Sequence, residues 1–177
     1  IIAPMYNEQD NVQITLERII SVLDPLKTNY EIIFVNDGST DDTLSICEEA
    51  KSEYPMLEIV SYTPSRGRGN ALRRGIEKAS GNYVFTIDFD LSYDESHILK
   101  MYEELVNNPH LDAVLVSCYM PGGKTVGVSP FRLLLSKGGN MILRTAFSPK
   151  IYTSTCVVRG YKREVIQSIP LDSEDKE

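Results

Sequence analysis

The chain is poor in cysteine and has no surplus of basic residues. Its three cysteines, Cys47, Cys118 and Cys156, lie far apart and include no C-x-x-C pair, which indicates a reducing compartment and gives no zinc-site signal. The formal net charge of −7 disfavours nucleic acid as a partner. No apolar run approaches the ~20 residues that a membrane-spanning helix needs, and no signal peptide is visible.

The length of 177 residues predicts one domain, large enough to bury a core without disulfide bonds. The sequence opens in mid-strand at Ile1-Ile2 and closes in the charged run Asp172 to Glu177. We therefore expect residues 1–177 to be a single domain cut at both ends from a longer protein, with a membrane anchor possible outside it.

Strand and helix patterns alternate along most of the chain. Apolar, β-branched runs predict strands over residues 1–3, 30–35, 57–62, 83–87, 113–117 and 151–158. Helical spacing of apolar residues predicts helices over 8–23, from 41 after the second strand, 71–79, 94–107, 129–147 and 162–169. We expect Pro4 to end the first strand, because it offers no ladder donor, and Asn7 to cap the first helix. This alternation predicts an α/β fold with a parallel sheet covered on both faces.

Two carboxylates, Asp88 and Asp90, follow the most strand-like stretch of the chain. Ligands of α/β proteins bind just beyond the ends of buried parallel strands. Two carboxylates at such a position repel each other unless a cation lies between them, and Mg²⁺ or Mn²⁺ bridging phosphate oxygens fits this need. The alternative is a strand end capped by two solvated acids, since a D-x-D pair is a short motif.

Three other polar segments also follow predicted strands: residues 4–8, 36–39 and 66–70. In a parallel sheet these ends meet at one edge, so the four segments together predict a binding site. Asp37 could accept hydrogen bonds from a base or ribose. Arg66 and Arg68 lie beside a predicted helix N-terminus, which suits a diphosphate. Taken singly, 36–39 could be an Asx turn and the arginines a solvated face.

The glycine pattern disfavours two other nucleotide-binding folds. Gly67 and Gly69 lack the G-x-G-x-x-G spacing and follow the third strand instead of the first, so they are a weak dinucleotide fingerprint. A nucleotidyltransferase would carry a glycine-rich phosphate loop after the first strand, and residues 4–8 contain no glycine.

Seven stretches carry a family resemblance. Four follow strands: Pro4-Met5-Tyr6-Asn7-Glu8, Asn36-Asp37-Gly38-Ser39, Gly67-x-Gly69-Asn70-Ala71 and Asp88-Phe89-Asp90-Leu91. Together these resemble the successive motifs of the family 2 glycosyltransferases. The chain is most similar to their dolichol- or polyprenyl-phosphate sugar synthases, which three later stretches match in part: Ser117-Cys118-Tyr119, Arg132 before Ser136-Lys137-Gly138-Gly139-Asn140, and Val158-Arg159-Gly160-Tyr161-Lys162-Arg163-Glu164.

The resemblance implies a GT-A fold, a Rossmann-like three-layer α/β/α sandwich whose mostly parallel sheet has one antiparallel strand. It implies an inverting glycosyltransferase that depends on Mg²⁺ or Mn²⁺ and moves a sugar from a UDP- or GDP-sugar to a polyprenyl or dolichyl phosphate. Asp88 and Asp90 would bind the metal and, with Arg132, form the catalytic set. With the 66–70 loop included, the expected donor-binding residues are Pro4, Tyr6, Glu8, Asp37, Arg66, Gly67, Asp88, Phe89 and Asp90.

Arg132 and Lys137 are the expected ligands of the acceptor phosphate. That phosphate is already ionised at neutral pH, so no general base is needed to activate it. Three residues depart from the subgroup: Cys118 replaces an arginine, Thr153 replaces an acidic residue, and Ser92 replaces a residue that helps hold the metal in some relatives. These departures concern the acceptor more than the donor.

Residues 129–147 combine apolar side chains with Arg132, Lys137 and Arg144. This composition is typical of a helix on a membrane surface, and equally of a core helix with solvated charges. The membrane alternative predicts a peripheral protein at the cytoplasmic face.

Two other functions remain open from the sequence. The same donor could serve a saccharide hydroxyl, in which case a catalytic Asp or Glu would follow shortly after Glu177. A binding domain could instead keep the nucleotide pocket without turnover.

Overall fold

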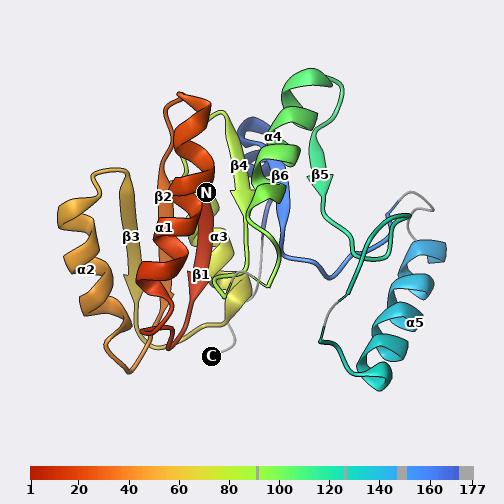
Figure 1. Cartoon of the computed structure of the whole chain (residues 1–177), viewed down its shortest axis with the longest axis horizontal. Coiled ribbons are helices and arrows are strands. Elements are labelled where there is room, and N and C mark those ends of the chain that lie inside the picture. Colours follow the sequence, from red (N-terminus) through yellow and green to blue (C-terminus); the bar gives the residue numbers. More distant parts are fainter. Residues whose placement is uncertain (91, 126, 147–150, 172–177) are drawn as a thin grey trace.

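The structure is a computed structural model that describes residues 1–90, 92–125, 127–146 and 151–171. Six strands form one sheet in the order β3-β2-β1-β4-β6-β5 (Figure 1). The strands are β1 (Ile2–Met5), β2 (Ile32–Asp37), β3 (Leu57–Tyr62), β4 (Tyr83–Thr86), β5 (Ala113–Leu115) and β6 (Arg159–Lys162). The helices are α1 (Val12–Leu23), the short 3-10 helix η1 (Asp24–Leu26), α2 (Thr43–Glu53), α3 (Arg68–Lys78), α4 (Ser96–Asn107), α5 (Pro130–Ala146) and α6 (Arg163–Ser168).

The sheet is mostly parallel, as predicted. β1 pairs in parallel with β2 and β4, and β2 pairs in parallel with β3. β6 is antiparallel to both of its neighbours, β4 and β5. The predicted α/β/α sandwich with one antiparallel strand is therefore confirmed.

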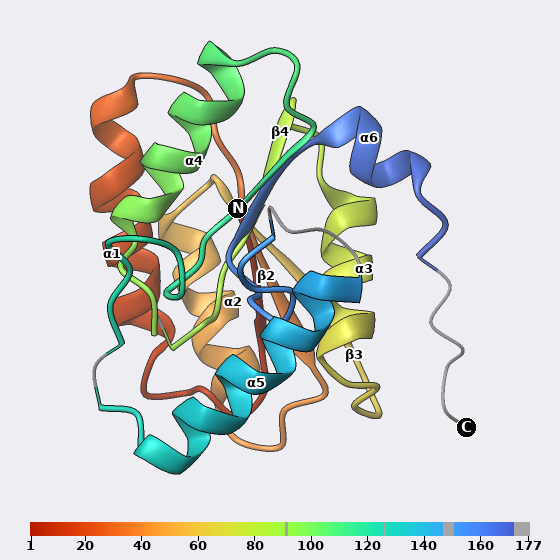
Figure 2. The ribbon, with the colours of Figure 1, turned by 90° about the vertical axis from the view of Figure 1, so that its right-hand side faces the viewer.

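Helices cover both faces of the sheet and bury a core on each (Figure 2). On one face Phe34 and its neighbours pack against α1, α2 and α4. On the other, Ile33 and Val35 pack against α3 and α6. Because successive strand residues point to opposite faces, a strand buried on both faces needs a continuous apolar run, and β2 begins with one.

β1 is the point at which the topology changes direction. From β1 the chain proceeds through β2 to β3 on one side, and β4 then pairs with the opposite side of β1. The carboxyl ends of β1 and β4 therefore flank a topological switch point, where open α/β sheets place their ligands.

Pro4 does not end the first strand, contrary to the prediction. β1 continues to Met5, with Pro4 opposite Val35 of β2. Along a strand, alternate residues turn their backbone groups toward alternate neighbours. The Ile2 carbonyl accepts from Ile87 on the β4 side. Pro4 is two residues further along, so its nitrogen, which has no hydrogen to donate, faces the same side. The ladder with β4 stops at Ile2, so no hydrogen bond is lost there.

The first helix begins at Val12 instead of residue 8, and Asn7 is not its N-cap. Asn7 has a left-handed φ of 55°, which asparagine tolerates better than most residues. Its side-chain oxygen accepts from the Thr40 N–H at 2.8 Å, and its own N–H donates to Ser39 Oγ at 2.9 Å. Asn7 thus ties the loop after β1 to the loop after β2.

The prediction of a strand over 151–158 was also wrong. The last strand is β6, which begins at Arg159, and residues 151–158 form no regular element. β2 likewise lies two residues later than expected, so that Asn36 and Asp37 belong to the strand. α3 begins at Arg68, three residues before its predicted start.

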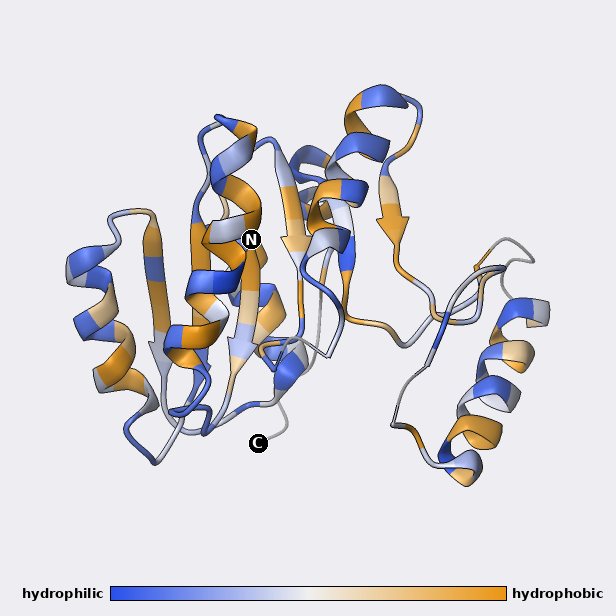
Figure 3. Ribbon diagram, in the orientation of Figure 1, coloured by the Kyte–Doolittle hydropathy of each residue, from blue (hydrophilic) through white to orange (hydrophobic). Residues whose placement is uncertain are grey.

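α5 stands apart from the sheet (Figure 1). The only buried residue described in it is Asn140, while Phe131, Leu134 and Ile142 are 69%, 68% and 67% exposed. Hydrophobic and hydrophilic segments alternate along this helix (Figure 3). Within the part of the chain that the structure describes, α5 is not a core helix. Phe147, which the sequence prediction included, lies outside the described residues.

Candidate active site

A cavity of about 310 Å³ lies at the carboxyl ends of β1, β2 and β4, beside the switch point. We call it the acidic cavity, because Glu8, Asp37, Asp88 and Asp90 line it. Most of the predicted donor-binding residues line it. Its full lining is Pro4, Met5, Tyr6, Glu8, Asp37, Ser65, Arg68, Ala71, Asp88, Phe89 and Asp90. The convergence of four strand-end segments on one place is therefore present in the structure.

Phe89 fixes the segment that carries the two aspartates. Its ring is 4% exposed and packs edge-to-face on Phe34, with the ring centroids 4.9 Å apart. Its backbone carbonyl accepts from Thr15 Oγ1 of α1 at 2.8 Å. Because Phe89 turns inward, its neighbours Asp88 and Asp90 are free to turn toward the cavity. Thr15 had no predicted role, and no local pattern in the sequence indicates this contact.

Asp88 and Asp90 differ in their surroundings. Burial raises the pKa of Asp88, the guanidinium of Arg68 lowers it, and the charge of Asp90 raises it again, so that the pKa lies above its ordinary value. Arg68 Nη1 is 3.4 Å from Asp88 Oδ1. Asp90 is exposed, and its Oδ1 accepts from the N–H and Oγ of Ser92 at 3.0 and 2.6 Å.

This pair of carboxylates fits a hard divalent cation. Both offer oxygen ligands, which Mg²⁺ and Mn²⁺ prefer, and a cation between them would offset the burial and the repulsion from Asp90 that raise the pKa of Asp88. The described residues contain no cluster of three or more His, Cys, Asp or Glu side chains suited to a metal. Two carboxylates agree with the usual Mg²⁺ arrangement, in which substrate phosphates and water complete the coordination.

Asp37 binds the loop that precedes α3. Its Oδ1 accepts from the Arg66 N–H at 2.8 Å, and its Oδ2 accepts from Ser65 Oγ at 2.7 Å and the Gly67 N–H at 2.9 Å. Burial alone would raise the pKa of Asp37, but the nearby Tyr62 hydroxyl and these donors outweigh it, and the pKa lies below its ordinary value. Asp37 is therefore an ionised anchor for residues 65–67.

Two glycines allow the end of β2 to lie close to residues 65–67. Gly38 has a φ of +72°, and a Cβ there would lie 2.7 Å from the Ser65 nitrogen. Gly67 has a φ of +85°, in the region that side chains rarely adopt. The close contact between the end of β2 and the start of α3 therefore depends on both.

The loop after β1 is held against the loop after β2. The Glu8 N–H donates to Thr43 Oγ1 at 2.8 Å, and Asn11 Nδ2 donates to Glu8 Oε2 at 2.6 Å. Tyr6 beside it is 50% exposed at the cavity. These contacts fix Glu8, which lines the cavity together with Tyr6.

Some predicted site residues lie elsewhere. Arg66 and Gly67 do not line the cavity, but their backbone N–H groups bind Asp37. Arg132 and Lys137 are exposed on α5, outside the cavity lining. Among the lining residues that the sequence prediction omitted, Ser65 acts through its bond to Asp37. Its only sequence signal was its place directly before Arg66.

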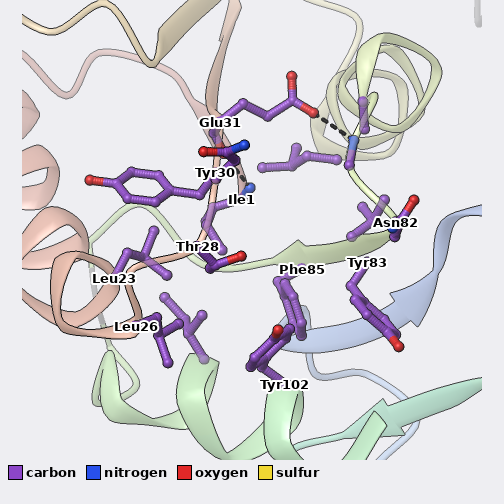
Figure 4. Close-up of a pocket in the computed structure, with 16 residues that line it drawn as sticks. Ile1, Leu23, Leu26, Thr28, Tyr30, Glu31, Asn82, Tyr83, Phe85 and Tyr102 are labelled. Carbon is purple, nitrogen blue, oxygen red and sulfur yellow. Dashed lines mark hydrogen bonds between the residues drawn. The ribbon is translucent and has the colours of Figure 1, made fainter. Parts of the chain in front are cut away.

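A second cavity, of about 190 Å³ (Figure 4), lies at the other end of the strands. Phe85, Tyr83 and Tyr102 form part of its wall. The Glu31 carboxylate accepts from the N–H groups of Ser80 and Gly81 at 2.7 and 2.9 Å, so it holds the turn before β4. This cavity lies at the amino ends of the strands and shares no lining residue with the acidic cavity.

The fold and the acidic cavity together define an α/β protein with a ligand site at the carboxyl ends of its strands. Residues 1–169 match the family model described as glycosyl transferase family 2. The chain belongs to this family of glycosyltransferases.

Two curated relatives match almost the whole chain. It is 34% identical over 175 residues to the dolichol-phosphate mannosyltransferase of Pyrococcus furiosus, a match that covers 97% of this chain and 48% of the relative. It is 28% identical over 178 residues to the undecaprenyl-phosphate 4-deoxy-4-formamido-L-arabinose transferase of Pectobacterium carotovorum, covering 96% and 50%. The chain thus spans about half the length of these relatives.

A solved structure agrees on the fold. A mannosyltransferase from Pyrobaculum calidifontis in complex with GDP-Man and Mn²⁺ superposes with a TM-score of 0.65 at 22% identity, over 98% of this chain and 48% of that one. Among the described residues, none of the helices has the length and apolar character needed to cross a membrane.

Proposed function

We propose that this chain is the catalytic domain of a metal-dependent, inverting glycosyltransferase that moves a sugar from a UDP- or GDP-sugar to a polyprenyl or dolichyl phosphate. The observation that carries the proposal is the cavity at the switch point, where Asp88 and Asp90 lie together with Arg68. Relatives named for dolichol phosphate and undecaprenyl phosphate support the lipid acceptor.

In this proposal Asp88 and Asp90 hold Mg²⁺ or Mn²⁺ against the donor. The cation supplies positive charge that neutralises the departing diphosphate as the bond to the sugar breaks. Arg68, whose side chain is 65% exposed, exchanges its contact with Asp88 for a diphosphate oxygen. Its place in the first turn of α3 adds backbone N–H groups and the helix dipole, both of which favour an anion.

The remaining donor-binding residues orient the nucleotide. Pro4, Tyr6 and Glu8 form one wall of the cavity. Asp37 acts mainly by holding residues 65–67, since both of its carboxylate oxygens already accept hydrogen bonds there. Arg66 and Gly67 belong to the donor site through that same loop.

The acceptor side of the proposal rests on α5. Arg132 and Lys137 bind the lipid phosphate, whose oxygens are ionised at neutral pH and attack the sugar without a general base. The exposed apolar side chains of the same helix, among them Phe131 and Leu134, lie in the surface of the membrane that holds the lipid. The protein is then peripheral, at the cytoplasmic face of that membrane.

A donor and acceptor panel tests the proposal. The purified chain is incubated with UDP- and GDP-sugars, with and without Mn²⁺, and with one of three acceptors: polyprenyl phosphate, the matching unphosphorylated polyprenol, or an oligosaccharide. We expect nucleoside diphosphate to be released only when one donor, Mn²⁺ and polyprenyl phosphate are all present.

Three results would contradict it in distinguishable ways. Equal release with polyprenol would show that the lipid phosphate is not the nucleophile. Release only with an oligosaccharide would favour a transferase that acts on a saccharide hydroxyl. Donor binding without release under any condition would favour a binding domain.

A further inference from the structure

Cys118 and Cys156 lie on two neighbouring segments just beyond the ladder between β5 and β6. These strands pair with Ala113 opposite Tyr161 and Leu115 opposite Arg159. The Val116 N–H still donates to the Val158 carbonyl at 3.2 Å. Cys118 is two residues beyond Val116, in the turn that follows β5, and Cys156 is two residues before Val158, in the irregular segment that precedes β6.

Both cysteine side chains lie beside Tyr93. Val116, Val158 and Cys156 belong to the core on the side of α4. Tyr93, which precedes α4, interacts with both cysteine side chains through its hydroxyl group. The two segments remain side by side beyond the strands, because the hydroxyl groups of Ser117 and Thr153 are in hydrogen-bonding contact.

A disulfide bond joins Cα atoms roughly 4.4 to 6.8 Å apart, so it needs two segments that are held close together. The hydrogen bonds between Val116 and Val158 and between Ser117 and Thr153 hold the two cysteine-bearing segments together at this place. In the structure all three cysteines are free thiols.

We propose that Cys118 and Cys156 are a redox-sensitive pair, a modification site that closes into a disulfide bond when it meets a small disulfide such as oxidised glutathione. Cys118 is half-buried and lines an open cavity of about 750 Å³, so the oxidant reaches it first. Cys156 is 5% exposed and lies behind it.

The exchange proceeds in two balanced steps. The Cys118 thiolate attacks one sulfur of oxidised glutathione, which breaks that disulfide and releases one glutathione thiolate. The Cys156 thiol then gives up its proton and attacks Cys118 Sγ, which displaces the second glutathione. The protein loses two protons and two electrons, and the oxidant is reduced to two thiols.

The bond would form at the border of the candidate active site. Cys156 lies near enough to Asp88 to feel its charge. Arg159 donates from Nε to the Cys156 carbonyl at 2.6 Å and from Nη2 to the Ser154 carbonyl at 2.5 Å, and the Ser154 N–H donates to Asn140 of α5 at 2.9 Å. Oxidation would therefore join the loop after β5 to the segment that holds α5.

Peptide mapping of the wild-type chain tests the pair independently of any transferase activity. The reduced chain is equilibrated with oxidised glutathione, the remaining thiols are alkylated in denaturant, and the digest is analysed by mass spectrometry without reduction. We expect a peptide that links Cys118 to Cys156, a monomeric chain that has lost the mass of two hydrogen atoms, and an alkylated Cys47. Reduction with dithiothreitol should restore both thiols.

Two variants sharpen the result. Cys156→Ser should leave Cys118 as a stable mixed disulfide with glutathione, whereas Cys47→Ser, in the matched control, should leave the linked peptide unchanged. The proposal is overturned if wild-type Cys118 ends as a mixed disulfide while Cys156 remains a thiol. Disulfides that join Cys47 or two separate chains in place of this pair would also overturn it.

Discussion

Asp90 is the residue on which the proposed chemistry depends most directly. Its exposed side chain contacts Ser92 and lines the acidic cavity, while Phe89 beside it supplies the packing. Function and stability are thus divided between adjacent positions, and each can be changed separately.

Asp90→Ala should abolish metal-dependent transfer, with a loss of at least about a hundredfold in kcat/KM, because a metal ligand is removed. The thermal midpoint should be unchanged, since no buried contact is lost. Steady-state kinetics with Mn²⁺ and a melting curve check both points. The matched control is Asp94→Ala, at an exposed aspartate whose carboxylate accepts from the Ser96 N–H. Retained activity in Asp90→Ala would refute the metal assignment.

Asp37 should affect stability in a pH-dependent way. Its pKa is lowered on folding, so the carboxylate stabilises the folded chain above its ordinary pKa of 3.8, and the contribution is lost as the pH falls through the lowered value. Asp37→Asn should cost about 1–3 kcal/mol at neutral pH, because an amide cannot accept all of these hydrogen bonds.

Urea unfolding from neutral pH to about pH 3 checks this expectation. The difference between wild type and Asp37→Asn should shrink at the acid end. A difference that stays constant or grows toward low pH would mean that the carboxylate charge is not what holds residues 65–67. Asp10→Asn, at an exposed aspartate, serves as the control.

At the scale of elements, α5 carries two kinds of side chain with separable effects. Arg132 and Lys137 are charged and exposed, and Leu134 and Leu135 are apolar and 68% and 60% exposed. The charged residues should govern the acceptor, and the leucines should govern the attachment to a membrane.

Arg132→Ala should raise KM for polyprenyl phosphate about tenfold and leave KM for the donor unchanged, because a charge-assisted hydrogen bond to one substrate is lost. Initial rates at varied acceptor and varied donor separate the two constants. Lys78→Ala, at an exposed position of α3, is the control. An equal rise in both constants would count against a role in acceptor binding.

Leu134→Ser combined with Leu135→Ser should weaken binding to anionic lipid vesicles about tenfold, because both side chains lose apolar burial in the membrane surface. Vesicle co-sedimentation measures this. Ile14→Ser changes an equally apolar residue that is 55% exposed on α1 and should leave binding intact. If both variants bind as well as wild type, α5 is not the membrane contact.

The sequence predicted most elements, and the errors have physical causes. The range of β3 was predicted correctly, because its run of residues 57–62 is strongly strand-like. Pro4 was wrongly predicted to end β1, because the hydrogen bond that a proline cannot donate is lost only where a paired strand lies on that side. The strand at 151–158 was misplaced because pairing with Phe85 and Val114, which are distant in sequence, selects 159–162 instead.

The candidate site was predictable as a set and less so in detail. Parallel strands bring their carboxyl ends to one edge, which is why Asp37, Asp88 and Asp90 could be grouped without coordinates. The hydrogen bonds from residues 65–67 to Asp37 could not be foreseen, since they depend on how closely two loops approach in space.

For the whole molecule, donor binding should be visible as added stability. A ligand at a hundred times its Kd stabilises the folded chain by about 2.7 kcal/mol, which for a domain of this size is a rise of roughly 5–10 °C in Tm. UDP or GDP should give this rise with Mn²⁺ and lose it when the metal is removed with EDTA. An equal rise in EDTA would show that the diphosphate binds without the cation.

The antiparallel placement of β6 has a consequence for how such chains can diversify. β5 ends, and β6 begins, at the end of the sheet where the acidic cavity lies. The segment between them, which includes α5, is therefore attached to the sheet at two points on the same end of the sheet as that cavity. A chimera that exchanges this segment alone would change what approaches the sugar, while β1 to β4 and their donor pocket stay as they are.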